Sequence, residues 1–181
     1  VLVSAGRLHP NKAFDTLIDA LSALPLCISG RSLHLVIVGA GPLEAQLRTH
    51  ARSRHVTERT HFVGWQRDLG PYYGLADVFV CPSRIEPLGN VILEAWSHGV
   101  PVVSTASAGG TELIQDDVNG RLVPINDGDA LAAAIHEVLE SDPTARSALA
   151  QAGRRTLEAE YSRDAVLSAY LRMYEILLQD R

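Results

Sequence analysis

The sequence predicts an α/β protein in which a parallel six-stranded sheet carries helices on both of its faces. Apolar runs rich in β-branched residues recur along the first two thirds of the chain, at residues 1–6, 33–38, 61–64, 77–81, 101–104 and 120–123. Between these runs, apolar residues recur at spacings of three and four, which is typical of amphipathic helices. Because strand and helix alternate repeatedly, the strands are expected to run parallel.

The first two strands each lead directly into a helix. Residues 7–12 form the turn between the strand at 1–6 and a helix with apolar Phe14, Leu17, Ile18, Leu21 and Leu24. The strand at 33–38 ends in Gly39-Ala40-Gly41, which resembles the start of a dinucleotide-binding fingerprint, but Leu43-Glu44 stands where the third glycine would fall. We interpret these glycines as a tight turn beside a ligand, and a role in turn geometry alone stays open.

After residue 123 the pattern becomes purely helical, with helices predicted around 131–139, at 145–161 and at 164–178. The last of these carries an apolar stripe. The simplest expectation is that this stripe packs on the sheet of its own domain; the alternative is that part of it crosses to another domain. We expect some exposed apolar surface at 174–178.

The composition limits what the chain can bind. A chain of 181 residues can form one domain that buries roughly 70% of its unfolded surface. The net charge is −5, and no cluster of Lys and Arg exceeds a pair, which argues against nucleic acid as a partner. No apolar run reaches the roughly 20 residues that cross a bilayer, and we see no signal peptide. We therefore expect one cytoplasmic domain over residues 1–181, with Cys27 and Cys81 as free thiols.

The segment from Glu86 to Glu94 places two carboxylates around a glycine turn that opens a helix beside a buried strand. Gly89 permits a close backbone approach, and Asn90 can cap the helix. Free N–H groups and the positive end of the helix dipole favour an anion there, such as phosphate. A carboxylate only accepts hydrogen bonds, so Glu94 suits a vicinal diol such as that of a ribose, and Glu86 suits the hydroxyls of a hexose.

Cations follow the first strand. Arg7 and Lys12 come after its carboxyl end, and in a parallel sheet the carboxyl ends of the strands share one edge. These side chains and the loop of Glu86 are therefore expected to meet in one crevice. Arg7 offers a fork to phosphate oxygens and Lys12 a compact charge, so together they can stabilise a leaving diphosphate without a metal. The sequence thus predicts a site for a nucleotide diphosphate that carries a sugar.

A series of motifs follows in order along nearly the whole chain: Gly6-Arg7-Leu8 with Lys12, Val38-Gly39-Ala40-Gly41-Pro42, Phe62-Val63-Gly64-Trp65, Ala76-Asp77-Val78, Pro82-Ser83 with Glu86 to Glu94, Gly99-Val100-Pro101-Val102-Val103, Gly109-Gly110 with Glu112, and Asn119-Gly120. In these motifs the sequence resembles the carboxy-terminal, nucleotide-sugar-binding domain of the retaining glycosyltransferases of the GT4 group, also called group 1. The resemblance implies a Rossmann-like domain that is one half of a GT-B fold.

The resemblance also implies roles for individual residues. Arg7 and Lys12 would grip the diphosphate, Glu94 would bind the ribose, and Glu86 would bind the hydroxyls of the donor sugar. Of these, Arg7, Lys12 and Glu86 would act in catalysis. The other residues implied at the donor site are Gly41, Gln66 beside the base, and the backbone of Leu88, Gly89, Asn90 and Val91.

The activity implied by the resemblance is transfer of a sugar from a nucleotide-diphosphate donor to an acceptor, with retention of configuration and without a metal or other cofactor. The acceptor would bind to an absent amino-terminal domain, towards which residues 160–181 can extend. The chain alone is then expected to be inactive or weakly active. Bacterial polysaccharide or lipopolysaccharide synthesis is the expected setting, and the absent domain allows peripheral association with the inner face of the membrane.

Two other functions stay open, a sugar-nucleotide epimerase of the same architecture and a non-catalytic nucleotide-binding module. An epimerase would need acid and base groups that the sequence does not identify.

Three positions depart from the pattern of the family. Ala13 stands where a glycine usually follows the lysine, Leu88 where phenylalanine is common, and Trp96 where methionine is more usual. The first concerns the geometry of the turn around Lys12, and the other two concern packing.

Several polar residues are expected to have no catalytic role. Asp127 and Asp129 resemble the metal-binding Asp-x-Asp of another glycosyltransferase class, but they immediately precede a helix, where acids cap N–H groups. The seven histidines lack metal-ligand spacing. Ser83 and Ser104 have no identified base partner, so a nucleophilic triad is not supported.

Overall fold

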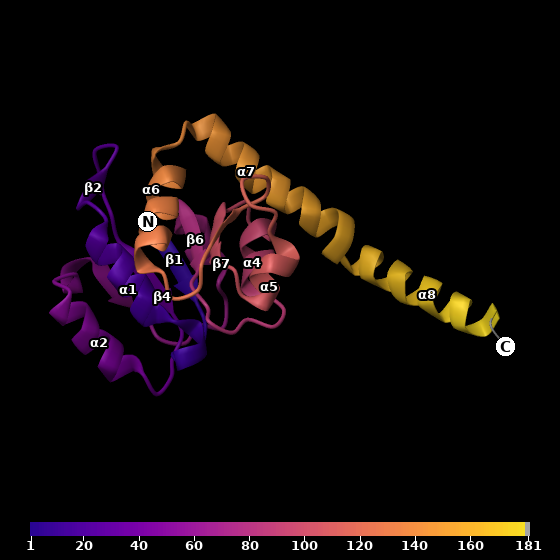
Figure 1. Ribbon diagram of the computed structural model, residues 1–181, viewed down its shortest axis with the longest axis horizontal. Helices are drawn as coiled ribbons and strands as arrows, with labels where there is room; N and C mark the ends of the chain where they lie inside the picture. The colour runs from indigo at the N-terminus through magenta and orange to yellow at the C-terminus, as the bar shows by residue number, and fades with distance from the viewer. Residues whose placement is uncertain (180–181) are drawn as a thin grey trace.

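Six parallel strands form one sheet, in the order β5-β4-β1-β6-β7-β8, in the computed structural model, which describes residues 1–179 (Figure 1). Each strand lies within one or two residues of its predicted position. Their bounds are β1 (Leu2–Ala5), β4 (Leu35–Val38), β5 (Thr60–Phe62), β6 (Val78–Cys81), β7 (Val102–Thr105) and β8 (Arg121–Val123). The strands β4 and β5, which follow β1 in the chain, lie on one side of it. The later strands β6, β7 and β8 lie on its other side. The direction therefore reverses between β1 and β6, and in open parallel sheets ligands bind in the crevice at this switch point.

Helices cover both faces of the sheet, as predicted. One core cluster joins α1 (Phe14–Ala23), α2 (Glu44–Ser53) and α6 (Gly128–Glu140) to one face, through side chains such as Leu2 and Val78. The other joins α3 (Gly70–Leu75), α4 (Asn90–Ser97) and α5 (Ala108–Leu113) to the opposite face, through Val3 and Phe79. Adjacent strand residues thus point to opposite faces, and both faces are apolar, as expected for a sheet buried on both sides.

Four short elements add to the predicted set. A small antiparallel hairpin joins β2 (Cys27–Ile28) to β3 (Arg31–Ser32), and Cys27, which is exposed and has a free thiol as predicted, lies in the first of these strands. Two 3-10 turns are η1 (Pro10–Lys12) and η2 (Thr57–Arg59). Two-residue strands and single turns carry too little periodicity to be recognised in a sequence.

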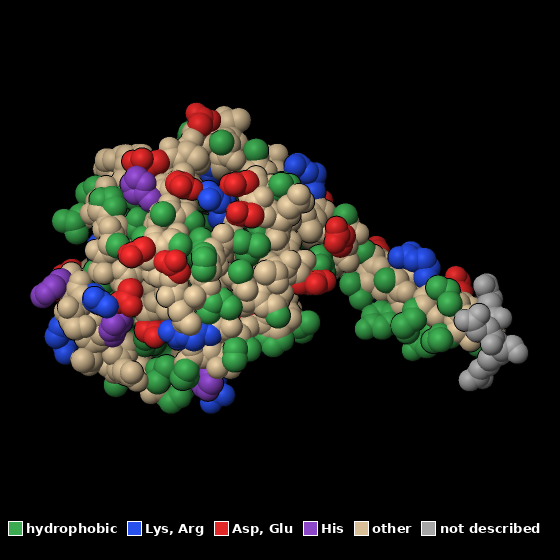
Figure 2. Space-filling model, viewed as in Figure 1, with side chains coloured by type: hydrophobic (Ala, Val, Ile, Leu, Met, Phe, Trp, Pro, Cys, Tyr) green, Lys and Arg blue, Asp and Glu red, His purple; other side chains and the backbone are tan. Residues whose placement is uncertain are grey.

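The carboxy-terminal part consists of α7 (Pro143–Thr156), a π-helical turn η3 (Leu157–Tyr161) and α8 (Arg163–Gln179). The helix α8 projects away from the sheet, so the expectation that it packs on its own domain is wrong (Figure 1). Its apolar side chains are exposed and gather along one side of the projecting helix (Figure 2). The expected apolar surface at 174–178 is confirmed, since Leu178 is 70% exposed and Tyr174 57%.

Trp96 is accommodated by a glycine on a neighbouring helix. Its indole is fully buried between α4 and α7, and a Cβ atom added to Gly153 would lie 2.2 Å from its Nε1. The tryptophan in place of the usual methionine therefore needs glycine at position 153. This departure from the family concerns packing, as expected.

Candidate functional site

The turns that follow β1, β4 and β5 lie side by side at the carboxyl edge of the sheet. The Gly6 N–H donates to the Val38 carbonyl at 2.9 Å, and the Gly39 N–H donates to the Gly64 carbonyl at 2.8 Å. A Cβ atom on Gly39, whose φ is +145°, would lie 1.9 Å from the Gly6 carbonyl oxygen. Only glycine allows the two backbones to approach this closely.

Gly41 has a packing role in the same turn. A Cβ atom there would lie 2.4 Å from the Leu8 carbonyl oxygen, so the missing side chain lets the turn lie against the backbone that follows β1. Gly41 does not line the pocket that Gly6, Gly39 and Ala40 help to form at this edge of the sheet. For this residue the geometry favours the turn interpretation over ligand contact.

A pocket of about 450 Å³ opens above these turns. Its walls bring together four of the predicted site residues: Arg7, Gln66, Val91 and Glu94. Trp65 also lines the pocket, and its side chain is 71% exposed. The Gln66 amide donates to the Val63 carbonyl at 3.0 Å, which leaves its side-chain oxygen available to accept. The volume falls within the range of pockets that bind small molecules.

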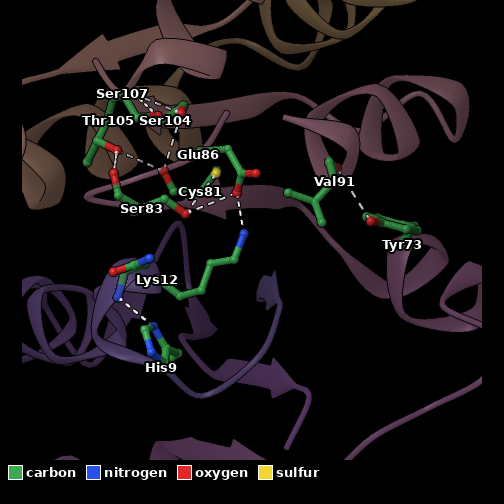
Figure 3. A network of polar contacts seen from close by, with 11 residues as sticks. His9, Lys12, Tyr73, Cys81, Ser83, Glu86, Val91, Ser104, Thr105 and Ser107 are labelled. Carbon is green, nitrogen blue, oxygen red and sulfur yellow. Dashed lines mark hydrogen bonds and ion pairs between the residues drawn. The ribbon is translucent and has the colours of Figure 1, made fainter. Parts of the chain in front are cut away.

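Lys12 and Glu86 form an ion pair beside this pocket (Figure 3). The stem of Lys12 runs over Gly6, a residue of the pocket wall, since a Cβ atom on Gly6 would lie 3.3 Å from Lys12 Cε. Glu86 is only 8% exposed, and the Ser83 hydroxyl donates to its Oε2 at 3.3 Å. The structure therefore places Arg7 and Glu94 on the wall of one pocket and the Lys12–Glu86 ion pair next to it.

Ala13 closes the turn that carries Lys12. It has a left-handed backbone, with φ +50° and ψ +40°, and its N–H donates to the Pro10 carbonyl at 3.2 Å. A side chain is unfavourable in this conformation, which explains why glycine is usual at this position. The turn nevertheless forms with alanine, and the small methyl group is buried.

The backbone of the Glu86 loop is fixed on two sides. On one side the N–H groups of Arg84 and Ile85 donate to the Asn11 carbonyl, at 2.8 and 3.1 Å. On the other, the Gly109 N–H donates to the Glu86 carbonyl at 2.6 Å. The loop is thus held between the turn of Lys12 and the start of α5.

Arg84 adds a side-chain anchor to this loop. Its guanidinium donates to both carboxylate oxygens of Asp15 on α1, at 2.9 and 2.8 Å. Partial burial opposes the charged form of Asp15, but the hydrogen bonds and positive charge of Arg84 outweigh it and lower the pKa of Asp15. A paired fork of this kind fixes geometry as well as charge.

The start of α4 differs from the prediction. Gly89, with φ +71°, is the N-cap, whereas Asn90 is the first helical residue and makes no capping bond, so the predicted cap is wrong. The physical reason is the tight turn, because a Cβ atom at position 89 would lie 2.7 Å from Leu113 Cδ1. Leu88 is 69% exposed, and Leu88, Gly89 and Asn90 lie outside the pocket wall that Val91 joins.

Glu94 is an exposed residue one turn into α4, and it lines the pocket. Its Oε2 accepts a hydrogen bond from the hydroxyl of Tyr73 at 2.9 Å. Tyr73 could not be recognised as this partner from the sequence, because it lies on α3, a six-residue helix with no clear periodicity. The adjacent motif Ala76-Asp77-Val78 is the only signal that marks the region.

The acidic residues and histidines of the described part of the chain are dispersed. Within residues 1–179, no three His, Cys, Asp or Glu side chains are grouped so that they could hold a metal ion. Asp127 accepts a hydrogen bond from the Ala130 N–H at 2.8 Å, so its predicted capping role is confirmed.

None of the helices in the described part of the chain is long and apolar enough to span a membrane.

The model of the family "Glycosyl transferases group 1" matches residues 1–141. The chain belongs to this family. It is 40% identical over 173 residues to the lipopolysaccharide core biosynthesis glycosyltransferase LpsE of Rhizobium meliloti, covering 96% of this chain and 49% of LpsE. It is 36% identical to a GDP-mannose-dependent phosphatidylinositol monomannoside mannosyltransferase of Mycobacterium tuberculosis, covering 94% of this chain and 47% of that protein.

The fold is that of one half of the GT-B glycosyltransferases. The crystal structure of Anabaena Alr3699/HepE in complex with UDP and glucose superposes with a TM-score of 0.82 and 26% identity, covering 98% of this chain and 48% of that one. This group 1 domain thus spans about half the length of the relatives that it matches.

Proposed function

We propose that this chain is the donor-binding domain of a retaining glycosyltransferase, which takes a sugar from a nucleotide diphosphate without a metal ion. One observation carries the proposal: two motifs far apart in the sequence converge. Arg7 and Glu94 line one pocket, and Lys12 contacts Glu86 beside it. Cations flanked by carboxylates, at the switch point of a parallel sheet, suit a ligand with an anionic centre and hydroxyl groups at both ends.

In this proposal each group has one task. Arg7 and Lys12 bind the diphosphate and stabilise its charge as it leaves, so electrostatics and positioning supply most of the rate. Glu94 accepts hydrogen bonds from the ribose, and Glu86 accepts them from the sugar. Gln66 and Trp65 border the base, while the N–H groups at the start of α4 face the phosphate and sugar.

The relatives indicate which donors to try first. The Mycobacterium tuberculosis protein is named for GDP-mannose, and HepE was crystallised with UDP and glucose. We propose that the full-length protein acts in bacterial polysaccharide or lipopolysaccharide assembly in the cytoplasm, as the name of LpsE suggests. The acceptor would bind to the half that this chain lacks, so the chain alone should bind nucleotide and transfer little sugar.

Glu94→Ala tests the ribose contact. We expect the affinity for UDP or GDP, measured by titration calorimetry, to fall about tenfold, because a charged acceptor of the ribose hydroxyls is lost. Glu58→Ala, which removes an exposed glutamate outside the pocket, should leave the affinity unchanged. Equal affinities of the wild type and Glu94→Ala would remove the proposed role.

We further propose that α8 lies against the amino-terminal half in the full-length protein. The row of exposed apolar side chains on α8 supports this placement, because large exposed apolar patches usually mark an interface. In hydrogen exchange, the amides of residues 163–179 should be more protected in the full-length protein than in this chain. The same exchange rates in both would contradict this placement.

A further inference from the structure

Tyr73 lies behind the candidate site and contacts it through a single group. Its side chain is 2% exposed and does not line the pocket. The hydroxyl donates to Glu94 Oε2 at 2.9 Å and lies 3.4 Å from the Val91 carbonyl, both on the first turns of α4 (Figure 3 shows the Val91 contact). Since a hydroxyl has one hydrogen, the shorter contact, to the charged acceptor, is the stronger hydrogen bond.

The ring of Tyr73 is itself held in place. It stacks on His98, with ring centroids 4.9 Å apart and planes 25° from parallel, and it packs at a tilt against Phe79 on β6 at 5.4 Å. Burial, together with the charge and hydrogen bond of Glu94, raises the pKa of Tyr73 well above its usual value. The phenol therefore stays neutral and remains a donor at any physiological pH.

A glutamate on an exposed helix surface otherwise samples many rotamers, and fixing it on a ligand costs conformational entropy. A buried donor on one carboxylate oxygen selects a single orientation in advance and leaves the other oxygen for a ligand. We propose that Tyr73 is a positioning residue that holds Glu94 ready for the ribose hydroxyls and so sharpens the preference for ribose over deoxyribose. This inference rests on the proposed role of Glu94 as the ribose ligand.

The test compares ribonucleotides with their 2′-deoxy analogues. Titration calorimetry of UDP and 2′-deoxy-UDP, repeated with GDP and 2′-deoxy-GDP, gives the ratio of the two affinities for each variant. Tyr73→Phe keeps the ring between Phe79 and His98 and removes only the hydroxyl. We expect it to lower ribonucleotide affinity about fivefold and deoxyribonucleotide affinity less than twofold, so the ratio falls.

Tyr72→Phe is the matched control, because it removes a hydroxyl from the neighbouring residue of the same helix; it should leave both affinities unchanged. A double-mutant cycle separates a positioning role from a structural one. In a Glu94→Ala background, Tyr73→Phe should cause no further loss of ribonucleotide affinity.

The outcomes that overturn the inference are distinct. An unchanged ratio in Tyr73→Phe, or an equal loss of both affinities, overturns the role of Tyr73 and leaves that of Glu94 standing. If Tyr73→Phe lowers ribonucleotide affinity further in the Glu94→Ala background, the role of Tyr73 is likewise overturned and that of Glu94 stands. If the wild type binds ribonucleotides and 2′-deoxyribonucleotides equally well, the proposed role of Glu94 is overturned, and the role of Tyr73 with it.

Discussion

Replacing Arg7 by alanine in the full-length enzyme is expected to lower the rate of sugar transfer by about two orders of magnitude, as loss of a charge-stabilising group usually does. Arg7 is exposed, so its removal should leave the thermal stability unchanged. Steady-state kinetics with saturating acceptor would measure the effect, and Arg155→Ala, at an exposed site on α7, is the control. Activity of Arg7→Ala within twofold of the wild type would contradict the proposed role.

Lys12→Ala should reduce transfer as strongly but should also destabilise the domain, because it leaves the buried Glu86 carboxylate without its positively charged partner. Breaking a buried pair in this way costs on the order of 3 kcal/mol. Adding Glu86→Gln should restore much of the stability, measured by urea unfolding, without restoring transfer. Recovery of both would show that Lys12 acts only on the fold.

A third large effect is expected at Gly109, whose N–H donates to the Glu86 carbonyl and so supports the Glu86 loop. A Cβ atom at this position would lie 2.7 Å from Gly89 N and 2.8 Å from Glu86 O. Because both are backbone atoms, Gly109→Ala must displace the loop. We expect a destabilisation of about 2–3 kcal/mol and, since a shift of about 1 Å can cost a hundredfold in rate, a severe loss of transfer.

Gly74→Ala serves as the matched control. This glycine lies on α3, and an added Cβ atom there would have no neighbour within 4 Å, so the change should be neutral or stabilise by up to about 1 kcal/mol. Urea unfolding and nucleotide titration of both variants check these expectations. If Gly109→Ala binds and transfers like Gly74→Ala, the loop is not held as the structure shows.

The sheet could be predicted because each strand is marked by the residues of a short segment of the sequence. Each strand is an apolar run, and the rule that parallel strands end at one edge was sufficient to bring Arg7, Lys12, Glu86 and Glu94 together. The ion pair between Lys12 and Glu86 was not predicted, because the sequence indicates the shared edge of the sheet but not which side chains meet there. No knowledge of side-chain packing was needed to place these residues at the same edge.

The remaining features depend on contacts between elements. Tyr73 donates to Glu94 only because α3 and α4 pack together, and neither residue indicates the other in the sequence. Asn90 has the chemistry of a cap, but the space around Gly89 decides where the helix begins. For α8, the apolar stripe indicates burial without indicating which surface covers it.

We propose that a nucleoside diphosphate binds at the carboxyl edge of the sheet, between Arg7 and Glu94. Titrating UDP or GDP into the isotope-labelled chain, and following the backbone amide shifts by NMR, tests this most directly. We predict the largest changes at residues 5–7, 39–40, 65–66 and 91–94, around the pocket. Changes centred instead on residues 28–33 and 139–146, which line a separate pocket at the amino edge, would contradict it.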